Sequence, residues 1–187
     1  NDDSYYMRKN TSLSGLPFGP SGDYVTSASL GHWMAKAYAR SYARIISNTP
    51  SIDKELFVIR EYGPGNGELA AKILIELFDQ DIPLKKYELL EISKRFIEFQ
   101  KTKIADILKQ YDKSLYRRAN KILEWKLVEV DSEEFATNTD IDPINGLVIA
   151  NEIIDSFPVK VAVWQPNDEI LELGISISDK GDLEFQN

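Results

Sequence analysis

Three glycines in one short stretch are the most informative part of the sequence. Gly63, Gly65 and Gly67 alternate with other residues directly after an apolar run, and the acidic residues Glu61 and Glu68 flank them. Glycines at alternate positions allow the backbone to approach a ligand closely, and they direct the amides that start the next helix toward that ligand. This spacing predicts a small-molecule site at a turn between a strand and a helix.

The glycine turn does not fit a nicotinamide dinucleotide. The dinucleotide fingerprint requires a further glycine three residues after Gly65, and this chain has Glu68 at that position. A carboxylate there would lie beside the negative pyrophosphate of the cofactor. A nicotinamide-dependent oxidoreductase is therefore disfavoured, whereas a cationic ligand without phosphate is compatible with the turn.

Acidic and amide side chains also follow the later apolar runs. Glu91 ends the second run, Asp131 follows the third, and Asn151, Glu152 and Asp155 follow the fourth. In an open parallel sheet, ligands bind outside the carboxyl ends of the strands, so these side chains are candidate ligand contacts.

Several of these residues also have a purely structural explanation. Glu91 could be a solvated charge at the start of a helix. Ser27 could cap the first helix, and Asn151 and Asp155 could cap the turn before Pro158. The sequence leaves both explanations open.

Strands and helices alternate along most of the chain, which predicts a doubly wound α/β fold, a parallel sheet with helices on both faces. Apolar spacing and turn residues predict strands at 56–62, 87–91, 123–130 and 146–150, and helices at 27–46, 68–78 and 94–111. In the first helix, Leu30, Trp33 and Tyr42 are among the expected core residues. The run at 146–150 is apolar throughout, which predicts a strand covered on both faces.

The pattern changes near residue 156. Three short runs at 159–164, 170–178 and 182–185 are separated by turns without helices, which predicts an antiparallel meander appended to the sheet. We therefore expect one domain that consists of three parts. These are a loop or arm at 1–26, a ligand-binding core at 27–155 and antiparallel strands at 156–187.

Composition excludes several classes of function. The 187 residues include 22 Lys and Arg against 30 Asp and Glu, giving a net charge of -8, so a general basic surface for nucleic acid is not expected. The chain has no cysteine and a single histidine, which argues against thiolate chemistry and against a metal site. No apolar run is long enough to span a membrane. Acid and base chemistry would therefore depend on carboxylates, Tyr or Lys.

Three blocks together resemble one family. The segments at 22–27 (GDYVTS), 61–67 (EYGPGNG) and 151–158 (NEIIDSFP) are similar to those of the MidA-like family of class I S-adenosylmethionine (SAM) methyltransferases, which comprises mitochondrial complex I assembly factors and bacterial relatives. The resemblance implies a Rossmann-like fold, SAM as cofactor, and methylation of a protein arginine in complex I assembly. It covers about the first half of a typical member, so we expect an unfinished edge on the sheet.

The resemblance also implies a role for each candidate residue. Thr26 and Ser27 would close over SAM, Glu61 would lie near its methionine end, and Glu91 would bind its ribose. Asp131 would accept the adenine amino group, and the glycines would form the floor of the site. Asn151 would face the methyl donor, while Glu152 and Asp155 would hold the arginine guanidinium. The resemblance leaves open a homodimer, and it implies the cytoplasm for a bacterial protein or the mitochondrial matrix for a eukaryotic one.

The chain also departs from the family pattern. Ala28-Ser29 and Trp33-Met34-Ala35 replace segments in which the family usually has carboxylates, and Asn66 and Glu68 replace a common Arg and Thr. These changes alter polar positions near the expected ligand. A rival hypothesis is therefore an assembly or interaction protein that keeps the SAM-binding fold with weak catalysis or none.

Overall fold

The computed structural model describes residues 25–49, 56–128, 143–156, 159–166, 168–178 and 180–186. Asp131 and most of the expected arm at 1–26 lie outside the described residues. The chain divides into two compact units, Asn1–Ile153 and Ile154–Asn187.

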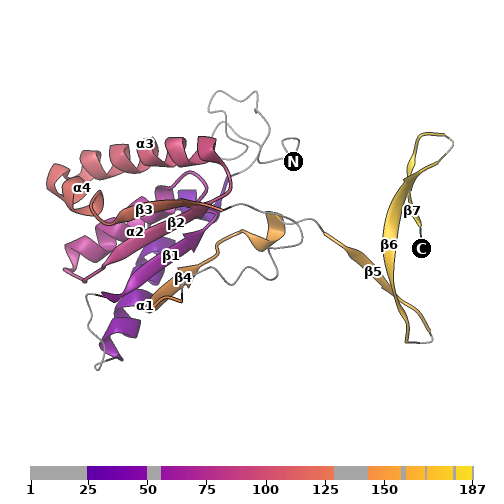
Figure 1. Ribbon diagram of the computed structural model, residues 1–187, viewed down its shortest axis with the longest axis horizontal. Helices are drawn as coiled ribbons and strands as arrows, with labels where there is room; N and C mark the ends of the chain where they lie inside the picture. Colours follow the sequence, from indigo (N-terminus) through magenta and orange to yellow (C-terminus); the bar gives the residue numbers. More distant parts are fainter. Residues whose placement is uncertain are drawn as a thin grey trace. The chain divides into compact units, whose positions relative to one another are not determined.

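The first unit is built around a parallel sheet (Figure 1). Its four strands are β1 (Val58–Tyr62), β2 (Lys86–Glu91), β3 (Leu123–Leu127) and β4 (Gly146–Ile149), in the spatial order β3-β2-β1-β4. Every pairing is parallel, and Glu61 lies beside Leu89 on one side and Ile149 on the other. The carboxyl ends of β1, β2 and β4 therefore meet at one edge. This confirms the predicted α/β class.

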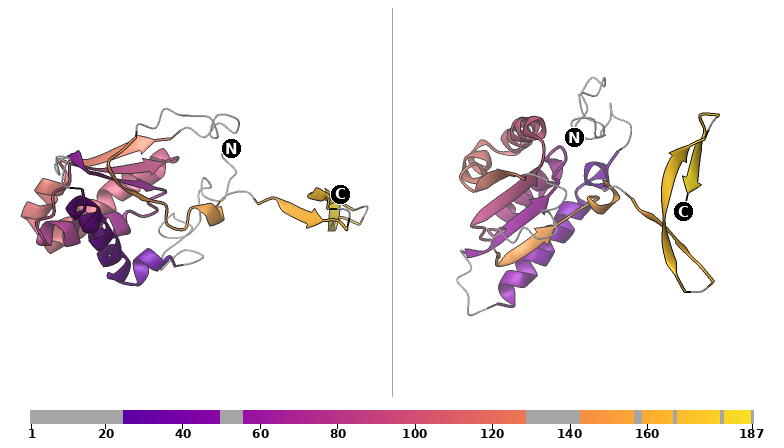
Figure 2. Two further views of the ribbon diagram at one scale, coloured as in Figure 1. Left: turned by 90° about the horizontal axis from the view of Figure 1, so that it is seen from below. Right: turned by 45° about the vertical axis from the view of Figure 1, so that its right-hand side comes forward.

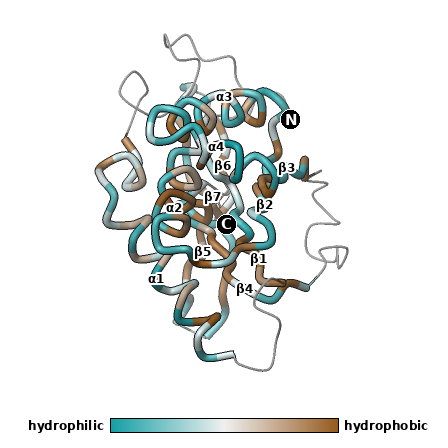
Figure 3. The backbone as a smooth tube through the Cα atoms, turned by 90° about the vertical axis from the view of Figure 1, so that its left-hand side faces the viewer, coloured by the Kyte–Doolittle hydropathy of each residue, from teal (hydrophilic) through white to brown (hydrophobic). Residues whose placement is uncertain are grey.

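The described helices form one layer against the sheet (Figure 2). They are α1 (Trp33–Ser47), α2 (Glu68–Asp79), α3 (Lys94–Tyr111) and the short α4 (Lys113–Ala119), and α1, α2 and α3 pack side by side in that order. Apolar residues along α2 supply much of the core between the layers (Figure 3), and Ile59 of β1 belongs to the same cluster. Ser93 caps α3 as expected, because its hydroxyl accepts the Phe96 N–H at 3.4 Å.

The opposite face of the sheet carries a charge network. Residues alternate between faces along a strand, so Ile59 and Glu61 face the helices while Arg60 points the other way. Glu88 of β2 accepts from Arg60 Nε at 2.6 Å and from Lys126 Nζ at 2.9 Å, which ties the three strands together. Within the described residues, the expected helical cover is thus present on one face of the sheet.

The first helix differs from its prediction. Ser27–Leu30 is a short 3-10 helix, η1, and α1 begins only at Trp33. Gly31 adopts an extended backbone (φ 159°) that separates the two. The buried face of α1 is formed by Ala35, Ala39, Tyr42 and Ile46, while Leu30 and Trp33 are 78% and 84% exposed. The break at Gly31 places the first two expected core residues outside the packed face.

Strand β4 is correctly located but is not covered on both faces. Ile149 is 1% exposed, whereas Val148, on the opposite face, is 54% exposed. The reason is that no described helix packs on the face to which Val148 belongs, and among the described strands β4 is the last in the sheet, next to β1 alone. The first unit therefore has an open sheet edge at β4 among the described strands.

The second unit is a three-stranded antiparallel meander. It contains the 3-10 helix η3 (Ile154–Ser156), followed by β5 (Val161–Trp164), β6 (Ile170–Ile177) and β7 (Leu183–Gln186). These strands form a sheet of their own, in the order β5-β6-β7, so the described residues do not extend the parallel sheet. None of the described helices is long and apolar enough to cross a membrane.

Candidate functional site

The glycine turn after β1 is tightly packed. Gly63, Gly65 and Gly67 all have left-handed backbones, with φ of 56°, 57° and 79°. A Cβ on Gly67 would lie 2.8 Å from Ile104 Cγ1, and one on Gly63 would lie 3.1 Å from Ile153 Cδ1. Conformation and space thus both favour glycine at these two positions.

Glu61, the last but one residue of β1, is buried below this turn. Its side chain accepts a hydrogen bond from the Tyr87 hydroxyl at 2.7 Å, and both residues are 2% exposed or less. Burial raises the pKa of Glu61 to about 7, and the bond from Tyr87 acts in the opposite direction. A cation at this place would find a carboxylate that ionises close to neutral pH.

Glu91, at the end of β2, is held by hydrogen bonds to both carboxylate oxygens. Oε1 accepts the backbone N–H groups of Ile92 at 2.9 Å and Ser93 at 3.1 Å. Oε2 accepts from the Gln100 side-chain amide at 2.8 Å. Burial raises the pKa of Glu91, and these hydrogen bonds oppose that rise. The carboxylate orientation is therefore fixed by the protein itself.

The side-chain amide of Gln100 joins the glycine turn after β1 to the acidic residue at the end of β2. Gln100 Nε2 donates to Glu91 Oε2 and also to the backbone carbonyl of Gly65, at 2.9 Å. Gln100 is completely buried. The glycine turn after β1 and the acid at the end of β2 are therefore held at a fixed separation.

The segment before α1 contacts the end of β4. The backbone N–H of Ser27 donates to Glu152 Oε1 at 3.1 Å, and the Ser27 hydroxyl donates to the same oxygen. Glu152 has a left-handed backbone, with φ of 51°. Thr26 precedes η1, and its hydroxyl lies 3.3 Å from that of Ser29. Ser27 thus binds Glu152, although helix capping was an equal expectation.

Lys72 anchors the same segment to α2. Its ammonium donates to the carbonyls of Ala28 at 3.0 Å and Gly31 at 3.1 Å, and pairs with Glu68 Oε1 at 2.8 Å. Asn66 Oδ1 accepts the Glu68 N–H at 2.9 Å. Both residues that depart from the family pattern in the glycine turn therefore have partners within the protein.

The structure groups most, but not all, of the expected site residues. Glu61, the three glycines and Glu91 form one cluster, and Ser27 contacts Glu152. Asn151 lies in the turn directly after β4. Asp155 is exposed in η3 and belongs to the second unit.

Sequence reasoning missed Tyr87, Gln100 and Lys72. Each is a buried polar side chain at a position where the apolar spacing of its strand or helix would place a core residue. The sequence does carry a signal for them, because each places a polar side chain at a position where the spacing predicts an apolar one. Among the described residues, no three side chains that could bind a metal come together.

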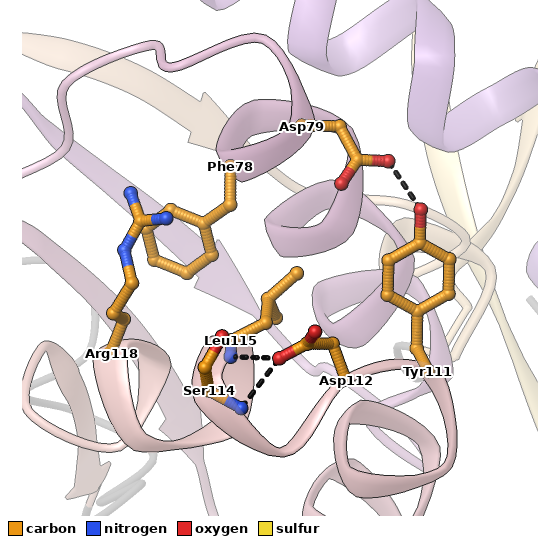
Figure 4. Close-up of a pocket in the computed structure, with 7 residues that line it drawn as sticks. All are labelled: Phe78, Asp79, Tyr111, Asp112, Ser114, Leu115 and Arg118. Atoms are coloured by element: carbon orange, nitrogen blue, oxygen red, sulfur yellow. Dashed lines mark hydrogen bonds between the residues drawn. The ribbon is translucent and has the colours of Figure 1, made fainter.

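A shallow hollow lies elsewhere on the first unit (Figure 4). It is lined by Phe78, Asp79, Tyr111, Asp112, Ser114, Leu115 and Arg118. The Tyr111 hydroxyl donates to Asp79, and Asp112 accepts two N–H groups at the start of α4. Phe78 and Asp79 end α2, whose first turn adjoins Gly67, so the hollow is a helix length away from the glycine turn.

Residues 30–187 match a family model described as "Putative S-adenosyl-L-methionine-dependent methyltransferase". Among curated proteins, no sequence matches the chain. Two solved structures from Burkholderia thailandensis are similar. One is called a "likely methyl transferase" and has S-adenosyl-homocysteine bound; it is 24% identical, with a TM-score of 0.65 over 90% of this chain. The other, a native structure, is 21% identical, with a TM-score of 0.57 over 86% of this chain.

These two structures support the fold. The chain spans only 38% and 37% of their lengths.

Proposed function

Because the chain belongs to the MidA-like family of SAM-dependent methyltransferases, we propose that it binds SAM at the carboxyl edge of its parallel sheet and methylates a protein arginine. The observation that carries the proposal is the bridge from Gly65 through Gln100 to Glu91. This bridge holds the glycine turn, where backbone can lie close to a ligand, beside the oriented carboxylate of Glu91. A nucleoside needs both, a floor without side chains and an acceptor for its ribose.

The charge at this edge suits a cationic ligand. SAM carries a sulfonium and an amino group, and Glu61 would favour the positive methionine end. The ionised form of Glu61 is disfavoured by burial, and an ammonium group close to it would compensate for that burial. The same carboxylate would repel a pyrophosphate.

Methyl transfer needs alignment more than acid or base chemistry. The methyl carbon would leave the sulfonium sulfur as a bond forms to a guanidine nitrogen. The sulfur becomes a neutral thioether, and the nitrogen gives up one proton to solvent water. Binding and orientation of the acceptor supply most of the rate enhancement in such displacements. Positions after β4 are suited to that role because they adjoin the glycine turn, as the packing of Ile153 on Gly63 supports.

Glu152 is the first candidate to hold the arginine. Ser27 occupies its Oε1, which leaves Oε2 for a guanidinium N–H. Paired carboxylates bind the forked guanidinium well. Asn151 would face the methyl donor, and Asp155 enters this proposal from the family resemblance alone. The proposal also includes a role in respiratory complex assembly, which is tested by identifying the methylated protein. It includes a homodimer as well, which is tested by measuring the mass in solution.

The proposal is tested by calorimetric titration with SAM and S-adenosylhomocysteine. The Glu91→Ala variant removes the ribose acceptor, and Glu98→Ala is the matched control, since Glu98 is an exposed carboxylate on α3. We expect saturable binding by the wild type and the control, and a loss of about tenfold or more in Glu91→Ala, the effect of removing hydrogen bonds to a charged acceptor.

Transfer is then measured with radiolabelled SAM and arginine-containing acceptor peptides. Label on arginine that is lost in Glu152→Gln supports the methyltransferase. Binding without transfer to any acceptor would select the assembly or interaction protein instead. No binding of either ligand by the folded wild type would contradict the proposed function.

A further inference from the structure

The proposed function uses Gln100 only as a bridge between Gly65 and Glu91, and it assigns this buried residue no part in selecting the ligand. Gln100 lies on α3 between Ile97 and Ile104, on the face that packs against the sheet. Both neighbours of its Nε2 are acceptors, a carboxylate oxygen and a backbone carbonyl. The amide orientation is therefore determined, because Oε1 in that place would face two oxygens.

The opposite side of this amide is also unusual. Gln100 Oε1 is buried and has no hydrogen-bond partner among the described residues. A buried acceptor without a donor is unfavourable, and such groups in native proteins call for an explanation. An apolar residue would fill the space without this penalty, so packing alone does not account for an amide here.

We infer that Gln100 is a positioning residue that sets the ribose selectivity of the site, by holding the Glu91 carboxylate and the Gly65 carbonyl in one fixed arrangement. The inference rests on the proposed SAM site and goes beyond it, because it assigns the discrimination of ribose from deoxyribose to a residue outside the glycine turn and the strand ends.

The physical basis is the rigidity of Glu91. Its Oε1 is occupied by two backbone N–H groups, so Oε2 is the oxygen with more free acceptor capacity. Only Gln100 bonds Oε2 among the described residues. A hydroxyl gains most from an acceptor that is already oriented, because no freedom is lost on binding. Without Gln100, Oε2 could rotate away or bind water.

The test is a ratio of two dissociation constants. S-adenosylhomocysteine and its 2′-deoxy analogue are titrated into wild type and Gln100→Met, which keeps the side-chain volume and removes the amide. In the wild type we expect the deoxy analogue to bind about tenfold or more weaker, the worth of one hydrogen bond to a charged group. In Gln100→Met we expect the ratio to fall close to one.

Gln80→Met is the matched control. Gln80 is an exposed residue after α2 whose amide donates to the Glu76 carbonyl, so its removal should leave the ratio unchanged. If Gln100→Met weakens both ligands equally and the ratio stays at its wild-type value, Gln100 has a structural role only and the inference is wrong. If the wild type binds neither ligand, the proposed function itself fails, which is a distinct outcome.

A second measurement covers the case in which Gln100→Met does not fold. In wild-type protein, the side-chain amide resonance of Gln100 is followed by NMR during both titrations. A larger shift with S-adenosylhomocysteine than with the deoxy analogue supports the inference. Equal shifts at saturation overturn it.

Discussion

At the scale of single residues, the candidate site is defined by buried polar groups that form hydrogen bonds with one another. Glu61 and Tyr87 lie on neighbouring strands and share one hydrogen bond, and Glu91 and Gln100 share another. Burial makes each of these bonds important, since removing one partner takes from the other a hydrogen bond that replaced its lost hydration. Mutations here should change ionisation as well as stability.

Glu61 should make the protein less stable as the pH rises. Its folded pKa is about 7, above the ordinary value of 4.5, so between these values the folded state holds a proton that the unfolded state has lost. The free energy of unfolding should therefore fall across this window, by up to about 1.4 kcal/mol per pH unit, and level off above it. Glu61→Gln should lack the part of the slope that Glu61 contributes, and a smaller fall should remain because burial also raises the pKa of Glu91.

The measurement is urea unfolding at about pH 5 and about pH 7.5. Glu98→Gln, at an exposed position, is the control and should retain the wild-type slope. Parallel pH dependence in wild type and Glu61→Gln would show that Glu61 titrates normally.

Tyr87→Phe should move the ionisation of Glu61 in the folded protein to higher pH. The Tyr87 hydroxyl lowers the pKa of Glu61 from the value that burial alone would give. Without it, stability should continue to fall above about pH 7, where the wild type is level. Tyr42→Phe is the matched control, because it removes a buried hydroxyl that donates to the Pro83 carbonyl at 3.0 Å. An unchanged pH profile in Tyr87→Phe would contradict this account.

At the scale of elements, the sequence predicted which helices and strands are present better than it predicted where each one begins and ends. The strands of the parallel sheet appear where alternation of apolar runs and turns placed them, and β1 and β2 begin within two residues of expectation. Such runs are strong signals because burial of a whole strand requires them. The α/β class and the glycine turn followed from this pattern.

The misses at this scale have specific physical causes. Apolar spacing continues across Gly31, but a tertiary contact decides the local structure there, since Lys72 binds the carbonyls of Ala28 and Gly31. Contacts between distant segments, such as Ser27 with Glu152, also leave no periodic signal. The candidate site was therefore predicted at the strand ends, while its supporting residues in α2, α3 and β2 were not.

Lys72→Met should release η1 from α2. The substitution removes the ammonium group that binds the carbonyls of Ala28 and Gly31 and the carboxylate of Glu68. We expect a loss of about 1–3 kcal/mol in the free energy of unfolding. It should also cause faster amide exchange at residues 27–31, whose carbonyl anchors are lost. Lys101→Met is the control, because Lys101 forms an exposed pair with Glu98. Unchanged exchange at 27–31 would show that Lys72 does not hold this segment.

At the scale of the whole molecule, the two units differ in how much they bury. The register of the meander places an all-apolar set of side chains on one face: Val161, Val163, Leu171, Leu173, Ile175, Ile177, Leu183 and Phe185. Ile177 and Leu183, which form a cross-strand pair, are 72% and 74% exposed. Among its own described residues, this unit has no second layer that packs on that face, so little of its apolar surface is buried within the unit itself.

Hydrogen exchange should separate the units. Amides of β2, flanked by two strands and packed under helices, should exchange on the order of a thousandfold more slowly than those of β6, whose opening exposes little further apolar surface. Mass spectrometry of exchanged peptides measures both. Comparable protection of β6 and β2 would mean that another surface, such as a second copy of the chain, covers the meander.

The central claim is that the carboxyl edge of the parallel sheet binds SAM and excludes a dinucleotide. It is tested most directly by titrating the wild-type chain with S-adenosylhomocysteine and, in parallel, with NADH, and following both binding heat and thermal unfolding. We predict saturable binding and a raised melting temperature with S-adenosylhomocysteine, and neither with NADH. Stabilisation by NADH, with no response to S-adenosylhomocysteine, would contradict the account.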